Sequence, residues 1–229
     1  MSREWSVVGA AMSGVSVACA LAVTVAVVRR EFTATDEPTF RPRSIRDYSP
    51  VPVEDWDLLM AGGHRIGAES AVLKVVEFGD FQCPACRRFH ESAMSPLLAQ
   101  HPEQVSLIFY HWPLPYHRDA YAGARAAECA ADQGRFAEMV DALYRWQDSL
   151  GHSPPQFFAD VAKVPDQARF SGCAVATDSV SVINRHMELA RRLGGIGTPT
   201  LIMNGQILRY VPDSAGLAAI FEQARKGQL

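Results

Sequence analysis

The sequence has no excess of basic residues. Its 229 residues include 22 Lys and Arg against 25 Asp and Glu, which gives a formal net charge of −3. Because nucleic-acid binding relies on clustered positive charge, the composition gives no case for a nucleic-acid partner. The chain also lacks internal repeats and low-complexity tracts. Its length therefore predicts one sizeable domain with a tail, or two small domains.

Charged residues are absent from the stretch between Trp5 and Val28. A helix of about 20 apolar residues crosses a bilayer, so residues 1–30 are predicted to be an N-terminal membrane anchor that contacts the membrane through residues 5–28. A cleaved signal peptide is the alternative, because Ala18-Cys19-Ala20 matches a small-x-small cleavage site. The Lys and Arg counts at the two flanks mildly favour the C-terminal side as cytoplasmic.

Cysteine is scarce, and the ligands that would complete a metal site are missing. A zinc site built on Cys83 and Cys86 needs two more ligands at similar spacing. The seven histidines contain no His-x3-His pattern. The sequence therefore predicts no metal site and no cofactor, and it favours redox chemistry for this pair.

Residues 31–65 are rich in proline and charge, which predicts a linker and a lead-in to the domain. Residues 66–229 are predicted to form an α/β domain. An apolar strand over 71–79 precedes a helix over 84–100, which Pro96 should kink or end early. A second strand follows at 105–110. Strand, helix and strand within about 40 residues predict a parallel pair.

Strand signals nearly vanish over residues 112–197, where Ala-rich and amphipathic stretches predict a helical insertion. Strands return at 200–203 and 206–210. The dipeptide Asn204-Gly205 between them favours a type I′ hairpin turn. A last helix should begin near Asp213. This order predicts a mixed sheet with helices on both faces.

Cys83 and Cys86 occupy the junction between the first strand and its helix. Positions i and i+3 share a helix face about 5–6 Å apart, within reach of a disulfide. Cys83, at the helix entrance, lies near free N–H groups and the positive end of the helix dipole, which lowers the thiol pKa. Pro84 suits the first helical turn. Cys83 is therefore the expected nucleophile and Cys86 the resolving thiol.

Two further residues or motifs are candidates for the same site. Glu77 interrupts an apolar strand; if it is buried, its pKa rises and it can exchange protons with Cys86. The alternative is an outward-facing charge at a sheet edge. Thr198-Pro199 precedes a strand, where proline is tolerated, and its peptide bond could be cis. This second motif is weak when it stands alone.

In combination these motifs resemble the DsbA-like branch of the thioredoxin superfamily, above all its membrane-anchored or secreted bacterial members. The resemblance covers roughly residues 55–228. The motifs are Glu77-Phe78, Asp80-Phe81, Cys83-Pro84-Ala85-Cys86, Gly197-Thr198-Pro199-Thr200 and Asn204-Gly205. It implies an α/β thioredoxin-like fold with an inserted helical domain, here preceded by the predicted N-terminal transmembrane helix. It also implies that Pro199 is cis, that it faces the cysteines with Thr198 beside it, and that Glu77 is the family's buried acid.

The resemblance further implies a thiol–disulfide oxidoreductase that acts on exported proteins with thiols or disulfides. Substrate segments would bind in extended form near Pro199, and a membrane redox partner would reset the cysteine pair. Some relatives carry a second disulfide in the insertion, so Cys129 and Cys173 are candidates for a bridge, with buried free thiols as the alternative. A bridge would indicate an oxidising compartment. The catalytic domain is therefore expected outside the cytoplasm, in the periplasm or at the cell surface, against the flank charges.

Ala85 departs from the pattern of the best-studied oxidases, which carry His at this position to help stabilise the thiolate. Pro84 and Ala85 are thus the residues expected to tune the redox potential. Oxidase, reductase and isomerase all stay open as roles. A redox-inactive chaperone or binding module that uses the groove near Pro199 is an alternative from a different class.

Overall fold

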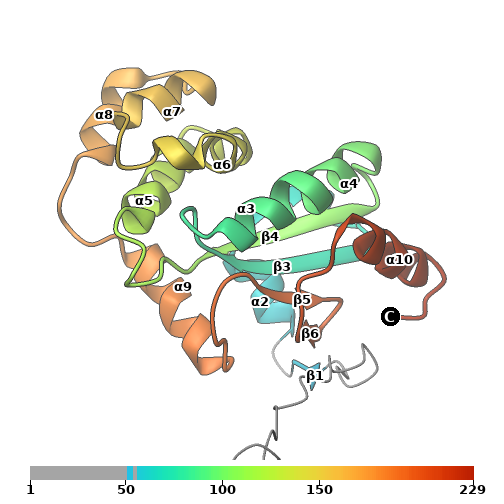
Figure 1. Ribbon diagram of the computed structural model, residues 1–229. Helices are drawn as coiled ribbons and strands as arrows, with labels where there is room; N and C mark the ends of the chain where they lie inside the picture. The colour runs from blue at the N-terminus through green and yellow to red at the C-terminus, as the bar shows by residue number, and fades with distance from the viewer. Residues whose placement is uncertain (1–50, 54–55) are drawn as a thin grey trace, which may run out of the picture. The chain divides into compact units, whose positions relative to one another are not determined.

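The computed structural model describes residues 51–53 and 56–229, which include a six-stranded sheet in the order β1-β6-β5-β3-β4-β2 (Figure 1). The strands are β1 (Val51–Pro52), β2 (His64–Gly67), β3 (Leu73–Gly79), β4 (Val105–His111), β5 (Thr200–Met203) and β6 (Gln206–Leu208). The helices are α2 (Trp56–Gly62), α3 (Pro84–Phe89), η2 (His90–Met94), α4 (Ser95–Gln100), α5 (Ala120–Ala131), α6 (Phe136–Arg145), η3 (Gln147–Ser149), α7 (Pro155–Val161), α8 (Gln167–Ala174), α9 (Ser181–Arg192) and α10 (Ser214–Arg225).

Strands β3 and β4 are neighbours inside the sheet and run parallel, as the strand–helix–strand pattern predicts. Every other neighbouring pair is antiparallel. All seven residues of β4 are buried, and so are six of the seven in β3. Strands that are covered on both faces are largely apolar along their length and do not alternate between apolar and polar residues. The strand directions confirm the predicted mixed sheet, in which β3 lies between β4 and β5.

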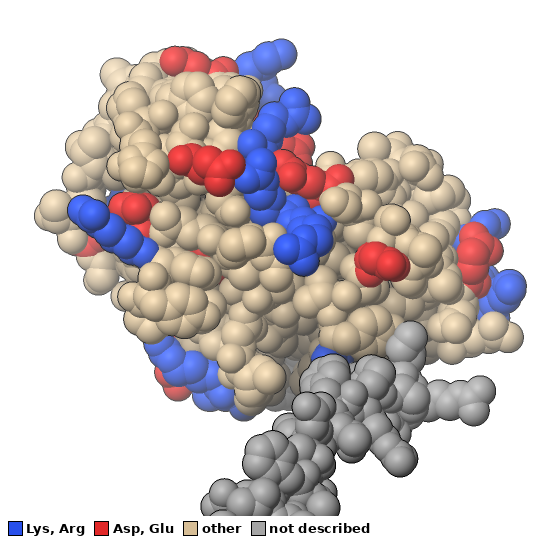
Figure 2. Space-filling view, in the orientation of Figure 1, with Lys and Arg blue, Asp and Glu red and all other residues tan. Residues whose placement is uncertain are grey.

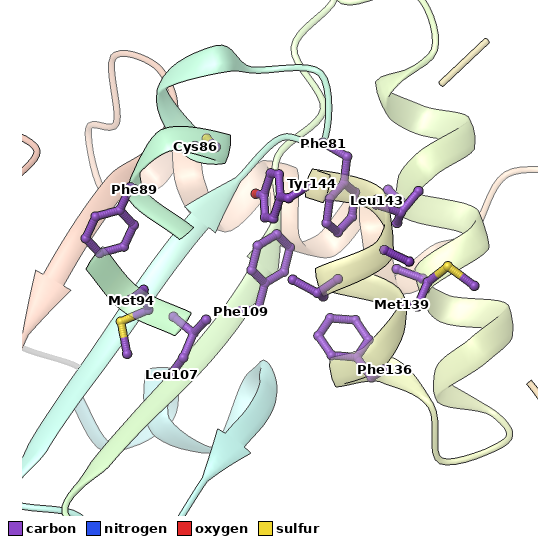
Figure 3. Packing of buried hydrophobic residues seen from close by; sticks show 14 of the residues in the cluster. Phe81, Cys86, Phe89, Met94, Leu107, Phe109, Phe136, Met139, Leu143 and Tyr144 are labelled. Atoms are coloured by element: carbon purple, nitrogen blue, oxygen red, sulfur yellow. The ribbon is translucent and has the colours of Figure 1, made fainter. Parts of the chain in front are cut away.

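The two faces of the sheet carry separate apolar clusters. Leu73 and Val75 of β3 pack on the side of α3, α6 and α10. Val76 and Phe78 point the other way and pack with side chains of α2 and α9. Figure 3 shows the first cluster, where rings of α6 meet Phe109 of β4. Because side chains alternate along a strand, Glu77 belongs to the face of Leu73 and Val75, the face that α3 covers.

The helix after the cysteines continues as far as Gln100, with a π-helical turn in its middle. Elements α3, η2 and α4 follow one another without a loop, and the Ser95 N–H donates to the carbonyl of His90, five residues earlier. Pro96, in the first turn of α4, has no N–H to donate. The expected effect of Pro96 therefore takes the form of a wider turn just before it, and the helix does not end early.

The insertion predicted over residues 112–197 is confirmed as helical: it contains α5, α6, η3, α7, α8 and α9. The predicted hairpin is also present. Asn204 and Gly205 have φ of 46° and 84°, and positive φ at both central residues is the requirement of a type I′ turn. Strand β6 ends at Leu208, earlier than expected, where its pairing with Leu201 of β5 ends.

The predicted membrane anchor, residues 1–30, lies outside the described residues. Among residues 51–53 and 56–229, no helix is both long enough and apolar enough to span a bilayer. Within the predicted lead-in, the described part already contains β1, α2 and the start of β2.

Candidate active site

The cysteine turn connects the C-terminal end of β3 to α3. Cys83 is the N-cap residue of α3, with extended backbone angles, and Pro84 is in the first turn. The Cys83 N–H donates to the Asp80 carbonyl at 3.1 Å, and the Arg87 N–H donates to the Cys83 carbonyl at 3.1 Å. Cys86 is completely buried, while Cys83 keeps 6% exposure. Both cysteines are free thiols, and only Cys83 has a surface to offer a substrate.

Asp80 holds the turn in shape, although it is 1% exposed. One carboxylate oxygen accepts from the Gln82 N–H at 2.7 Å. The other accepts from the Leu114 N–H at 2.7 Å and lies 2.8 Å from Nδ1 of His117. Several N–H groups thus satisfy the hydrogen-bonding capacity of this buried side chain. Asp80 therefore ties the turn after β3 to the segment after β4.

Gln147, from η3 of the helical insertion, fixes the same turn from the opposite side. Its side-chain amide donates to the carbonyls of Phe81, at 2.8 Å, and Cys83, at 3.1 Å. Sequence reasoning missed this residue. It lies 64 positions from Cys83, and no local pattern marks a buried glutamine as a ligand of a distant loop.

The Thr198-Pro199 peptide bond is cis and precedes β5. Strand β5 pairs antiparallel with β3 so that Phe78 faces Thr200. This register brings the residues just before β5 beside the end of β3, where the cysteine turn begins. The Cys83 thiol donates to the Thr198 carbonyl at 3.2 Å. Residues 115 positions apart thus form two sides of one site, with fully exposed Ile196 close by in sequence.

The pKa of Cys83 is lowered from 9.0 to about 5, chiefly because the Cys86 thiol hydrogen-bonds to its sulfur. Burial acts in the opposite direction. Further contributions that lower the pKa come from the Thr198 side chain and from the backbone N–H groups of Cys86 and Ala85. These amides belong to the first turn of α3, where N–H groups have no partner within the helix. A thiolate at Cys83 is therefore the expected form of the reduced protein at neutral pH.

The thiol pKa of Cys86 is shifted in the opposite direction from that of Cys83. Burial raises its thiol pKa well above 9.0, and the neighbouring Cys83 and Glu77 raise it further. Glu77 itself is completely buried on the central strand β3. Burial, followed by the charge of Cys83, raises the pKa of this carboxyl from 4.5 to about 8. An outward-facing charge at a sheet edge is excluded by this position.

Tyr144 of α6 faces the same buried region. Its ring packs at 5.1 Å from that of Phe81, and both labelled rings lie close to the start of α3 in Figure 3. Within the described part of the chain, neither the Tyr144 hydroxyl nor either oxygen of Glu77 has a partner in hydrogen-bond geometry. The hydroxyl is nevertheless close enough to act against burial and lower the pKa of Glu77. Unpaired buried polar groups are costly, and they concentrate at functional sites.

The surface next to the cysteines carries charges of both signs. Figure 2 shows basic and acidic side chains gathered over the region of α3 and α6, while much of the same face is uncharged. Arg87, one turn after Cys83, pairs with Glu91 at 3.2 Å and with Asp148 of η3 at 2.9 Å. These exposed pairs are each worth little energetically. They place α3 and the helical insertion side by side at the site.

Cys129 of α5 and Cys173 of α8 form a disulfide, with Cα atoms 5.8 Å apart. This bridge joins two helices of the insertion and lies away from the Cys83 turn. Neither Cys83 nor Cys86 belongs to the group of metal-ligating side chains found among the described residues, which is His64, His111 and Glu128.

Replacing Glu77 by Gln is expected to stabilise the protein at alkaline pH when Cys83 and Cys86 are thiols, the state to which the Glu77 pKa of about 8 belongs. The carboxyl ionises near pH 4.5 in an unfolded chain and near pH 8 in the folded one. The stability that the protonated carboxyl contributes to the fold is therefore fully present below pH 4.5 and is lost as the pH rises through 8. In urea unfolding, the free energy of unfolding of Glu77→Gln should exceed that of the wild type by more than about 1 kcal/mol at pH 8. This difference should disappear toward pH 4. Glu91→Gln is the matched control, because the Glu91 side chain is exposed. A stability gain that does not depend on pH would contradict the burial argument.

Comparison with known proteins supports the resemblance seen in the motifs. A family model described as Thioredoxin matches residues 60–223. A thioredoxin-like oxidoreductase from Silicibacter pomeroyi DSS-3 is 26% identical, with a TM-score of 0.60 over 74% of this chain and 97% of that one. DsbA2 from Pseudomonas aeruginosa is 28% identical, with a TM-score of 0.55 over 72% and 95%.

Among curated proteins, a Na(+)/H(+) antiporter NhaA 1 from Mycolicibacterium gilvum is 36% identical over 166 residues, which are 71% of this chain and 26% of that protein. The chain therefore spans about a quarter of the length of the curated relatives it matches.

Proposed function

Because the chain belongs to the thioredoxin family and is similar to its DsbA-like branch, we propose that it is a thiol–disulfide oxidoreductase whose Cys83–Cys86 pair oxidises thiols of exported proteins. One observation carries this proposal: the two sulfurs are strongly unequal. Cys83 has a pKa near 5 and a path to the surface, whereas Cys86 is enclosed and its pKa is raised. Unequal sulfurs give each exchange reaction a defined direction of attack.

The reaction begins with the Cys83–Cys86 disulfide. A substrate thiolate attacks the Cys83 sulfur, a mixed disulfide forms, and the Cys83–Cys86 bond breaks with its electron pair on Cys86. A second substrate thiolate then attacks the substrate sulfur of the mixed disulfide. The substrate leaves with a disulfide, and Cys83 leaves as a thiolate. The low pKa of Cys83 makes it a good leaving group in this second step.

Glu77 serves the buried sulfur in this scheme. When Cys86 is released as a thiolate it needs a proton, because burial disfavours its charge. A carboxyl with a pKa of about 8 is largely protonated at neutral pH and can give that proton. When the pair is re-oxidised, the same carboxylate can take the proton back. Glu77 thus exchanges a proton within the site while the sulfurs exchange electrons.

Substrate binding is assigned to the loop of Thr198 and Pro199. This loop contains the cis bond and lies against Cys83, whose thiol donates to the Thr198 carbonyl. An extended peptide with a cysteine could lie against this loop and place its sulfur near Cys83. Exposed Ile196 adds an apolar contact at the rim.

The site of action is proposed to be extracytoplasmic, in the periplasm or at the cell surface. Structural disulfides persist in oxidising compartments, and the chain contains one between Cys129 and Cys173. A membrane redox partner would re-oxidise the Cys83–Cys86 dithiol after each cycle, and residues 5–28 would keep the two proteins close. Ion antiport is not proposed, because the matched region is only about a quarter of each antiporter.

The direction of electron flow is tested by the reduction potential of the Cys83–Cys86 pair, measured by equilibration in glutathione buffers. A Cys83 pKa of about 5 lies between those of thioredoxin and DsbA, so we expect a potential between about −270 and −120 mV. The protein should then oxidise a reduced model substrate. A potential at or below that of thioredoxin would contradict the oxidase role and favour a reductase.

Ala85→His should shift the reduction potential toward the oxidising end, because a histidine beside the thiolate stabilises the reduced form.

A further inference from the structure

Three ligand-type side chains from three separate elements meet on the sheet face that also carries α3, and the ring of His111 lies 5.9 Å from that of Phe81. They are His64 of β2, His111 of β4 and Glu128 of α5. Nε2 of His64 and Nε2 of His111 each lie 2.7 Å from the same oxygen, Oε1 of Glu128. The three ligand atoms all lie within 4.8 Å of one another. Two imidazoles and one carboxylate thus converge on a single point.

The strand register explains why the histidines meet. Strand β2 pairs antiparallel with β4, and His64 faces Phe109. Side chains alternate along β4, so His111 projects from the same face as Phe109, diagonally across from His64. Helix α5 of the insertion brings Glu128 to this face, and the ring of Phe136 stacks on His64 at 3.9 Å. The cluster is therefore built by the packing of the insertion on the sheet.

These atoms match what zinc binds. Zinc accepts imidazole nitrogen and carboxylate oxygen at about 2.0–2.2 Å, and two histidines with one acid leave a fourth position open. Tetrahedral geometry sets ligand atoms about 3.3 Å apart, so each N···O pair would open slightly. His111 is fully buried and fixed by β4. The side chains of His64 and Glu128 are 26% and 15% exposed, so they can adjust and give an ion access.

Neighbouring His186 does not complete the set. Its ring stacks on His111 with centroids 5.7 Å apart. However, Nδ1 accepts from the His111 N–H at 3.2 Å, and Nε2 lies 3.1 Å from the Gly62 carbonyl. Both ring nitrogens are occupied by the backbone. The open position therefore lies on the solvent side, next to His64.

We propose that His64, His111 and Glu128 form a zinc site that ties the helical insertion to the sheet. Each imidazole binds through Nε2 as the neutral tautomer, with its hydrogen on Nδ1. The ion joins α5 to β2 and β4. Its ligand on α5, Glu128, is next in sequence to Cys129 of the Cys129–Cys173 bridge. This site departs from the sequence-based expectation of no metal, and neither Cys83 nor Cys86 is among its ligands.

The test is zinc titration of the full chain carrying Cys19→Ser, with Cys83 and Cys86 oxidised, so that no thiolate can bind the ion. Competition with a chromogenic chelator should give one zinc per chain. His64→Gln and Glu128→Gln should each weaken the affinity at least about tenfold. His90→Gln is the matched control, because His90 pairs with Asp141 at 2.7 Å without a third ligand, and its affinity should equal that of the wild type.

A thermal melt of each variant, with and without zinc, separates lost binding from lost folding. Zinc should raise the melting temperature of the wild type and of His90→Gln, but not of His64→Gln. X-ray absorption of the loaded protein should show only nitrogen and oxygen ligands. The proposal is overturned if the oxidised protein takes up no zinc, if all three variants bind equally well, or if sulfur appears among the ligands.

Discussion

Replacing Cys86 by Ala is expected to leave the protein covalently attached to its substrates. Cys83 remains at the N-cap of α3. It loses the Cys86 thiol that does most to lower its pKa, but the backbone amides of the first turn still favour the thiolate. It can still attack a substrate disulfide and form the mixed disulfide. The buried thiol that would resolve this bond is then absent, so the adduct accumulates. The adducts would be seen on non-reducing gels and identified by mass spectrometry after reduction.

The matched control is Cys83→Ser, which removes the accessible sulfur and keeps the buried one. We expect turnover to fall to the level of the uncatalysed exchange, with no adducts, because Cys86 is fully buried and its pKa is raised. Adducts through Cys86 in this variant would contradict the assignment of Cys83 as the nucleophile. Undiminished activity in Cys83→Ser would instead support a binding module that works without redox chemistry.

Removing the disulfide between Cys129 and Cys173 is expected to be the largest single loss of stability. The bridge closes a loop with a sequence separation of 44 residues. The chain-entropy model gives about 4 kcal/mol for such a loop, and measured values are typically about 2–4 kcal/mol. For a domain of this size the melting temperature of Cys129→Ala/Cys173→Ala should fall by roughly 10 °C. Differential scanning calorimetry measures this directly.

The control is Cys83→Ala/Cys86→Ala, which removes the same number of cysteines but a bridge across a very short loop. Its melting temperature should change much less. Below its own melting point, the Cys129→Ala/Cys173→Ala variant should keep its exchange activity, because the bridge joins α5 to α8 and does not touch the Cys83 turn. Equal melting temperatures for the two double variants would contradict a stabilising role for the bridge.

Asp80 and Gln147 are two residues of the site whose hydrogen-bond partners the local sequence does not predict. The sequence marks Asp80 only as part of a motif, but the structure shows its carboxylate serving the Gln82 N–H, the Leu114 N–H and His117. Gln147 has no sequence signal at all, because its acceptors belong to a turn 64 and 66 residues earlier. The helical insertion therefore helps to shape the active site, and the composition of the insertion alone does not predict this.

The local elements follow from the sequence because their causes are local. The cysteine spacing, with Pro84 in the first turn, determines that Cys83 begins a helix. Asn204-Gly205 determines the hairpin, since both residues tolerate positive φ. The scarcity of strand signals over 112–197 determines that the insertion is helical.

Only the tertiary structure decides which of these parts meet. It places cis Pro199 beside Cys83, Glu77 beneath Cys86, and Cys129 against Cys173. It also brings His64, His111 and Glu128 to one point. Each of these meetings joins residues from separate elements, whose distance depends on strand register and on the packing of whole helices. Nearest-neighbour preferences carry no information on either, so the chemistry of each residue can be read from the sequence while its partners cannot.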